Sequence, residues 1–121
     1  MICTLISYIS GVKTIKLYCV NDNWGGEVWE RLGYIIGKNT IVEELKMLGR
    51  RDLDVGEIFL GLQLNQHIQK LVFYGIDLTG TVKMNCLSPF LCNNPVLKKI
   101  DLSNCNLNSD GVNILAKALS N

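Results

Sequence analysis

Few residues in this chain have the types and spacing that catalysis or metal binding requires. Its five cysteines are odd in number and widely spaced: Cys3, Cys19, Cys86, Cys92 and Cys105. No Cys-x-x-Cys pair is present and His67 is the single histidine, whereas a zinc site needs a tighter cluster of ligands. We therefore expect no metal ion and no cofactor. Reduced, mostly buried thiols would suit a reducing compartment, and we predict that the protein is cytoplasmic.

The remaining candidates for acid–base chemistry lack partners in the sequence. His67 stands beside Ile68 in a predicted turn, without a partnered serine, cysteine or second histidine, which favours a surface or turn residue over a catalyst. Glu43 and Glu44 are adjacent on a predicted strand, so their side chains should face opposite sides of it and form no obvious acid pair. We predict no catalytic residue and no enzymatic activity.

The stretch "GKNT" at 37–40 matches the end of a phosphate-binding loop, Gly-x-x-x-x-Gly-Lys-Ser/Thr. Asn39, however, occupies the Ser/Thr place, Leu32 occupies the place of the first glycine, and the stretch follows a predicted helix instead of preceding one. We interpret Gly37 as the glycine that caps the end of this helix.

Two further stretches have a structural interpretation and a ligand-binding alternative. "NWGGEVW" at 23–29 is typical of a loop-to-helix junction in which Trp24 and Trp29 pack on or near the helix, and a glycine-rich ligand loop is the alternative. Arg50 and Arg51 in "GRRD" are interpreted as part of a solvated loop, with a phosphate contact as the alternative.

Length and composition limit the class of protein. The chain has 121 residues, 48% of them hydrophobic, which is enough for one domain with a core. Twelve basic and eleven acidic residues leave a formal charge of +1, without the basic excess of a typical nucleic-acid-binding protein. Lys13 and Lys16 interrupt the apolar start well before the roughly 20 residues that a membrane-spanning helix needs. We expect neither nucleic acid nor a membrane as a partner.

Apolar residues recur with one spacing in four segments. The matching sets are Val12, Ile15, Leu17 and Val20; Val42, Leu45 and Met47; Ile68, Leu71, Phe73, Ile76 and Leu78; and Leu97, Ile100, Leu102, Cys105 and Leu107. The units start near residues 12, 42, 68 and 97, which lie 30, 26 and 29 residues apart. Asn39, Asn65 and Asn94 each stand three residues before a start. Such internal repetition is the sequence signature of a solenoid.

Each unit combines two kinds of apolar pattern. The period of two predicts short strands whose inward residues are Ile15 and Leu17, Leu45 and Met47, Leu71 and Phe73, and Ile100 and Leu102. The segments "GEIFLGLQLN" from Gly56 and "GVNILAKALS" from Gly111 align without gaps and predict helices, with Leu60 over Leu115 and Leu64 over Leu119 in the apolar stripe. "GGEVWERLGYIIG" and "MNCLSPFLCNN" fill the corresponding places, the second as a weaker helix because it contains Pro89.

The repeat pattern resembles leucine-rich repeat proteins, and the period with a helical second half resembles the ribonuclease-inhibitor-like subfamily. The resemblance covers nearly all of residues 5–121. It implies an α/β solenoid, a horseshoe segment of about four strand–helix repeats with a parallel inner sheet and outer helices. We predict a single domain over 1–121, in which residues 1–11 are the end of a preceding helix.

The resemblance also assigns a role to one cysteine. In this family the place of Cys105 is usually Asn or Cys, turned inward to hydrogen-bond backbone left unpaired where the strand ends. Val20 and Ile76 cannot make such a bond, so we expect their turns to have another solution, and the unit after Met47 is irregular. Neither end of the chain has a polar cap. The alternatives are a fragment or short version of a longer repeat protein and end-to-end self-association.

The fold predicts one solvent-facing surface where a partner could bind. Residues that flank the inward pairs would form columns on the concave face of the sheet. The candidate partner-binding residues are Tyr18, Leu48, Tyr74 and Ser103 in one column, Lys16, Lys46 and Asp101 in a second, and Lys70 and Lys99 in a third. Aromatic and apolar side chains grouped on a sheet are typical anchors for a protein partner.

We therefore predict a non-catalytic protein–protein interaction module, such as a scaffold, that binds a protein partner on its concave face. One alternative is a regulator that activates a small GTPase, because Ran GTPase-activating proteins resemble this chain in repeat type. The other is a structural spacer within a longer repeat array. The identity of the partner does not follow from the sequence.

Overall fold

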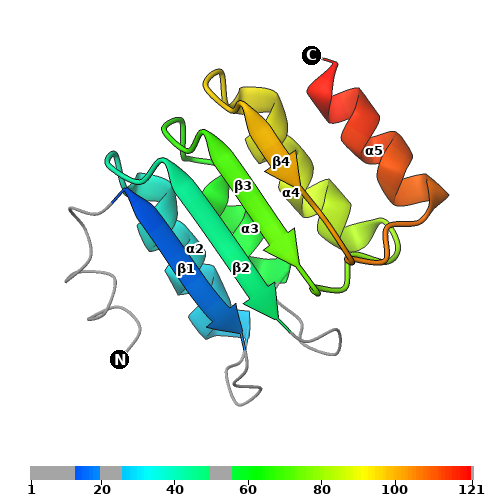
Figure 1. The fold of residues 1–121 in the computed structure, drawn as a ribbon, viewed down its shortest axis with the longest axis horizontal. Coiled ribbons are helices and arrows are strands. Elements are labelled where there is room, and N and C mark those ends of the chain that lie inside the picture. The colour runs from blue at the N-terminus through cyan, green and yellow to red at the C-terminus, as the bar shows by residue number, and fades with distance from the viewer. Residues whose placement is uncertain (1–12, 20–25, 50–55, 121) are drawn as a thin grey trace.

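The computed structural model describes residues 13–19, 26–49 and 56–120. Strands and helices alternate along the chain: β1 (Thr14–Cys19), α2 (Gly26–Lys38), β2 (Glu44–Gly49), α3 (Gly56–Leu62), β3 (Lys70–Tyr74), α4 (Val82–Asn93), β4 (Lys99–Asp101) and α5 (Ser109–Leu119). The strands form one parallel sheet in the order β1-β2-β3-β4, and the helices form a second layer behind it (Figure 1). The predicted α/β architecture of four strand–helix repeats, with a parallel sheet and a layer of helices, is confirmed. The expected helix end at 1–11 and the first repeat start at Val12 lie outside the described residues.

The strands pair at equivalent positions of the repeats. Thr14 lies opposite Glu44, Glu44 opposite Lys70, and Lys70 opposite Lys99. Just before each of β1, β2 and β3, one carbonyl accepts two backbone N–H groups from the next repeat; Lys13 O, for example, accepts from Glu43 N at 2.7 Å and Glu44 N at 3.0 Å. The register deduced from the apolar spacing is therefore the register of the sheet.

The core lies between the sheet and the helices. Inward strand residues such as Ile15, Leu45, Met47 and Leu71 are buried, and Phe73 stacks on Phe59 of α3 with ring centroids 5.3 Å apart. Each fully buried side chain of this size contributes roughly 1.5–3 kcal/mol to folding. One strand–helix unit has no second surface on which to bury these residues, so adjacent units stabilise each other.

The last repeat is buried less completely than the third. Leu97, Ile100, Leu102 and Leu107 are half-buried, whereas their counterparts Ile68, Leu71, Phe73 and Leu78 have no exposed side-chain surface. Within the described residues, β4 and α5 have neighbours on one side only (Figure 1). The apolar pattern is thus the same in both repeats, and the difference in burial comes from the number of neighbours.

Asparagine side chains hold the segments that enter the strands. Asn65 is buried, and its Oδ1 accepts hydrogen bonds from His67 N at 2.7 Å and Ile68 N at 2.8 Å. Its Nδ2 donates to Ile36 O at 2.9 Å and Asn39 O at 3.0 Å in the preceding repeat. One side chain therefore satisfies two N–H groups of its own repeat and two carbonyls of the neighbouring one.

The other two repeat-marking asparagines make parts of the same arrangement. Asn39 Oδ1 accepts from Ile41 N and Val42 N at 2.7 and 2.8 Å. Asn94 Oδ1 accepts from Val96 N, and its Nδ2 donates to the backbone of the preceding repeat, with the shorter bond, 3.0 Å, to Ile68 O. The asparagines that precede the repeat starts thus form side-chain hydrogen bonds that link consecutive repeats.

The turns after β3 and β4 have different inward residues. As the resemblance implied, the residue after β4 can hydrogen-bond the backbone and the residue after β3 cannot. Cys105 is buried, and its Sγ lies 3.4 Å from Phe73 O and 3.4 Å from Ser103 O, so the thiol faces strand-end carbonyls. Ile76 instead buries an apolar side chain, and Gly75 before it turns the chain with a left-handed φ of +74°. A Cβ at Gly75 would also lie 2.8 Å from Gly49 O. The turn that lacks a polar inward residue is therefore formed by a glycine, which adopts the left-handed conformation and allows the close approach of the backbone.

The interpretation of Gly37 as a helix cap is wrong. Gly37 lies inside α2, one turn after Gly33, and both face α3. A Cβ at Gly33 would lie 2.2 Å from Ile58 O, and one at Gly37 would lie 2.1 Å from Gly61 O. The backbones of α2 and α3 are therefore in direct contact, and the glycines are required by this contact.

The apolar stripe of α3 is not the one predicted. Ile58, Phe59 and Leu62 face the core, whereas Leu60 and Leu64 are 40% and 53% exposed. At about 100° per residue, Leu60 lies on the opposite side of the helix from the buried residues. The gapless alignment of this segment with that of α5 matched the spacing of the leucines. It did not predict which side of α3 faces the core.

Helix α4 continues through Pro89, which the sequence predicted to weaken it. Its 12 residues include Pro89 in the second half, and Met84, Leu87, Phe90 and Leu91 are buried. Proline removes one helical hydrogen bond, and the burial of these four side chains outweighs that loss. None of the helices within the described ranges has the length and apolar character needed to cross a membrane.

Candidate partner-binding surface

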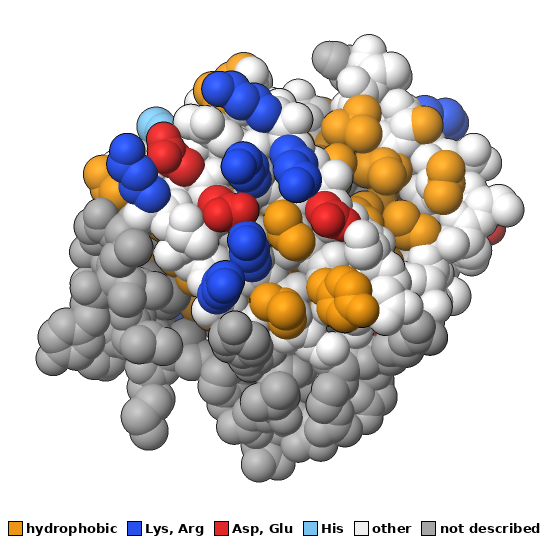
Figure 2. Space-filling view, in the orientation of Figure 1, with side chains coloured by type: hydrophobic (Ala, Val, Ile, Leu, Met, Phe, Trp, Pro, Cys, Tyr) orange, Lys and Arg blue, Asp and Glu red, His pale blue; other side chains and the backbone are white. Residues whose placement is uncertain are grey.

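The face of the sheet opposite the helices carries the predicted columns. Figure 2 shows this face, with basic, acidic and apolar side chains interspersed over the strands. One column runs Thr14, Glu44, Lys70 and Lys99, and the next runs Lys16, Lys46, Val72 and Asp101. Parallel pairing sets the members of a column about 4.8 Å apart. The structure thus brings five of the nine candidate residues into two regular rows.

The apolar part of this surface consists of Leu48, Val72 and Tyr74. Leu48 and Tyr74 are register partners on β2 and β3, and Val72 is two residues before Tyr74 on the same face. Leu48 and Val72 are half-buried, and Tyr74 is 50% exposed. The backbone of Tyr18 pairs with Leu48, but its side chain lies outside the described part of the chain. We call the three described side chains the apolar trio.

Ser103 does not extend this column onto the fourth strand. Strand β4 ends at Asp101, and Ser103 lies in the following turn. The Ser103 hydroxyl donates a hydrogen bond to Asp101 Oδ1, and Ser103 N donates to the same oxygen at 3.0 Å. These two bonds, the hydroxyl bond first, hold the pKa of Asp101 below its ordinary value, with a smaller contribution from Lys99. Ser103 therefore organises a turn that orients Asp101.

Removing the Ser103 hydroxyl is expected to raise the pKa of Asp101 toward its ordinary value. A carboxyl with a lowered folded-state pKa stabilises the fold above its unfolded pKa, and this contribution is lost as pH falls through the folded pKa. In Ser103→Ala the folded-state pKa of Asp101 should lie closer to its unfolded-state pKa. The contribution of Asp101 to stability should therefore be lost over a narrower range of pH. Carbon-detected NMR titration of the Asp101 carboxyl measures the shift. Ser103→Thr is the control, because Thr79 makes the same pair of bonds to Asp77; an unchanged Asp101 pKa in Ser103→Ala would contradict the assignment.

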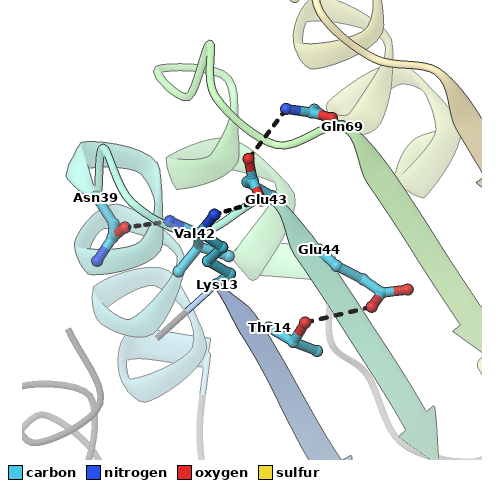
Figure 3. A network of polar contacts seen from close by, with 7 residues as sticks. All are labelled: Lys13, Thr14, Asn39, Val42, Glu43, Glu44 and Gln69. Atoms are coloured by element: carbon cyan, nitrogen blue, oxygen red, sulfur yellow. Dashed lines mark hydrogen bonds and ion pairs between the residues drawn. The ribbon is translucent and has the colours of Figure 1, made fainter. Parts of the chain in front are cut away.

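A polar network borders the surface where the strands begin (Figure 3). Glu43 lies 3.8 Å from Lys13 Nζ and accepts a hydrogen bond from Gln69 Nε2 at 3.2 Å. Glu44 accepts from the Thr14 hydroxyl at 3.4 Å. The two glutamates thus have separate partners, as predicted, although Glu43 lies just before β2 and only Glu44 is a strand residue. The sequence predicted their separation but not these partners, which stand in neighbouring repeats at equivalent positions.

Sequence reasoning missed a groove on the helical side. It lies along α2 and α3, has a volume of about 480 Å³, and is lined by Tyr34, Leu60, Leu64 and the acidic Glu27 and Glu30 among others. The exposed Leu60 of α3 and Leu64, two residues after the helix ends, form its apolar part. The signal in the sequence was Gly33-x-x-x-Gly37, because close approach of two helices requires such small residues.

The residues considered for metal or acid–base chemistry lie apart. Within the described ranges, no three His, Cys, Asp or Glu residues stand close enough to hold a metal ion. Cys86 is half-buried, Cys92 is exposed and Cys105 is buried, and His67 is exposed at the entry to β3. Trp29 is buried in α2, whereas Trp24, Arg50 and Arg51 lie outside the described residues.

Comparison with solved structures places the fold among known ones. The chain is similar to the structure named "Leiomodin-1 Actin-Binding Site 2 (ABS2)", with a TM-score of 0.61 and 13% sequence identity. The alignment covers 98% of this chain and 85% of that chain. No protein-family model and no curated protein matches the sequence. At this identity the similarity establishes a shared fold.

Proposed function

We propose that the chain is a non-catalytic module that binds a protein partner on the concave face of its sheet. The observation that carries the proposal is the apolar trio: Tyr74 is 50% exposed beside Leu48 and Val72 on a regular strand surface. Aromatic side chains held on a rigid surface contribute strongly to binding, because little conformational entropy is lost when they are covered. The surrounding charged columns would orient the partner.

The structural comparison supports a protein partner in general terms. The similar structure is named as an actin-binding site, so in that protein a domain of this fold is associated with protein binding. An identity of 13% gives no reason to transfer actin to this chain. We further propose the ribonuclease-inhibitor-like subfamily, on the repeat lengths of 26 to 30 residues with a helical second half, and a cytoplasmic location, on the cysteine usage.

The test is affinity capture from a native lysate followed by mass spectrometry. The baits are the parent chain, Leu48→Ser/Tyr74→Ser, and the control Val82→Ser/Val112→Ser. Val82 and Val112 are exposed apolar residues of α4 and α5, so the control removes equivalent apolar surface from the helical layer. We expect a protein that is captured by the parent and the control and depleted roughly tenfold or more by the double variant.

Circular dichroism establishes that all three baits are folded. Equal capture by the two double variants and the parent would contradict the proposal, since the partner would then bind elsewhere. Loss only in Val82→Ser/Val112→Ser would move the site to the helical layer. Absence of any captured protein would favour the spacer alternative.

A further inference from the structure

Positive charge is concentrated on the concave face. The column that begins at Thr14 and the column that begins at Lys16 together contain four lysines and two carboxylates, so their net charge is +2. The lysines are Lys16, Lys46, Lys70 and Lys99, and the carboxylates are Glu44 and Asp101. The whole chain has a formal charge of only +1. The remainder of the chain is therefore slightly acidic, and the excess of lysine on this face does not reflect a basic composition.

The lysines stand as two side-by-side pairs. Lys16 is the register partner of Lys46 on β1 and β2, and Lys70 is the register partner of Lys99 on β3 and β4. Like charges directly opposite each other on neighbouring strands destabilise a sheet. A carboxylate placed over either pair would relieve this repulsion, so both pairs are better suited to a bound state than to the free protein.

The carboxylates on this face already have partners. Glu44 accepts from Thr14 at 3.4 Å and lies 3.8 Å from Lys46 Nζ, and Asp101 accepts two bonds from Ser103. Among the described residues, by contrast, no carboxylate oxygen lies within 4.0 Å of the ammonium groups of Lys16, Lys70 or Lys99. Three of the four lysines are thus available to an incoming group.

We propose that the concave face binds an acidic segment of a protein partner that also carries an apolar side chain. The two lysine pairs are separated by two strand spacings and two residues along the strand, about 12 Å. About three or four residues of an extended chain span this distance. One carboxylate of the segment lies over Lys16 and Lys46, a second lies over Lys70 and Lys99, and the apolar side chain packs on the apolar trio. This inference rests on the concave-face binding proposed above and defines the chemistry of the partner.

A protein segment fits this face better than a nucleic acid does. A phosphate backbone would meet Glu44 and Asp101 in the same columns as the lysines, and their repulsion would oppose its binding. Within the apolar trio, Val72 stands in the second column, and Leu48 and Tyr74 lie two residues further along β2 and β3, where an aliphatic or aromatic side chain can cover them. Alternating carboxylate and apolar groups occur in a peptide and not in a phosphodiester backbone.

The test is selection of short random peptides displayed on phage against the immobilised 121-residue chain. Selection is repeated on Lys70→Gln/Lys99→Gln and on the control Lys38→Gln/Lys117→Gln, which removes the same charge from α2 and α5. We expect the parent and the control to enrich peptides with two acidic residues three or four positions apart and a nearby apolar residue. A selected peptide should bind Lys70→Gln/Lys99→Gln roughly tenfold more weakly.

The outcomes separate this inference from the proposed function. Enriched peptides that lack acidic residues, yet lose binding in Leu48→Ser/Tyr74→Ser, would overturn the acidic partner and leave concave-face binding intact. Acidic peptides that bind both double lysine variants equally would overturn the assignment to the lysine pairs. An oligothymidylate that binds as tightly as the selected peptide, and is lost in Lys70→Gln/Lys99→Gln, would replace the protein segment with a nucleic acid.

Discussion

Gly61→Ala is expected to lower the free energy of unfolding by about 3 kcal/mol or more. A Cβ at Gly61 would lie 2.2 Å from Gly33 C and 2.2 Å from Tyr34 N, and both atoms belong to the backbone of α2. A side chain can rotate away from such a contact, but a helix backbone moves only as a unit. Overpacking a core typically costs about 1–3 kcal/mol, and a backbone clash exceeds the usual case. Urea denaturation followed by circular dichroism measures the change.

Gly111→Ala is the matched control within a helix. Its Cβ would approach Leu107 Cδ2 at 3.0 Å, the end of a flexible side chain. The gain in helix propensity, about 1 kcal/mol, offsets a small adjustment of Leu107. We expect the stability of this variant to stay within about 1 kcal/mol of the parent. If Gly61→Ala were as stable as Gly111→Ala, the direct backbone contact between α2 and α3 would be wrong.

Asn65→Ala is expected to destabilise the chain by roughly 3–4 kcal/mol. The substitution removes four hydrogen bonds: those from the N–H groups of His67 and Ile68 and those to the carbonyls of Ile36 and Asn39. The Ile36 carbonyl keeps the bond from Asn39 N, so three backbone groups lose the side-chain partner without that second bond. Each buried polar group that loses its hydrogen bond costs about 1–3 kcal/mol, and water that enters the vacated space recovers part of this. The measurement is the same urea denaturation, with thermal unfolding as a second readout.

Asn39→Ala provides the comparison. Within the described ranges, the side chain of Asn39 has two hydrogen bonds, from Ile41 N and Val42 N of its own repeat, and the residue is half-buried. We expect a loss of about 1–2 kcal/mol. Equal decreases in the free energy of unfolding of the two variants would mean that the bonds from Asn65 to the preceding repeat contribute little. This result would contradict the role of the asparagines in linking the repeats.

The strand half of each repeat could be predicted from the sequence. Leu71 and Phe73 alternate with solvent-facing residues, and their equivalents stand at constant offsets in the other repeats. A period of two allows only one choice of inward face, so the register and both charged columns followed directly. The same reasoning wrongly placed Ser103 on the fourth strand, because the alternation of apolar residues does not show where the backbone pairing of a strand ends. The bonds from Ser103 to Asp101 replace strand pairing there.

The helical half was less predictable because helix rotation depends on packing. Leu60 and Leu64 have helical spacing, but the contact between Gly61 and α2 and the burial of Phe59 turn them outward. Gly37 has the local features of a helix end, and only the position of α3 explains its place inside α2. The concave surface was predictable to the extent that it follows from strand alternation. The helical groove was not, because it depends on the distance between two helices.

The contact between α2 and α3 has a consequence for the shape of the concave surface. A solenoid of strands and helices bends because helices usually pack 8–10 Å apart, whereas parallel strands lie about 4.8 Å apart. The glycines Gly33, Gly37 and Gly61 bring the two helix backbones together, which reduces this difference in width. We therefore expect the bend to be shallower between the first two repeats than between the later ones. A partner would meet a flatter surface at Lys16 and Lys46 and a more enclosing one at Lys70 and Lys99.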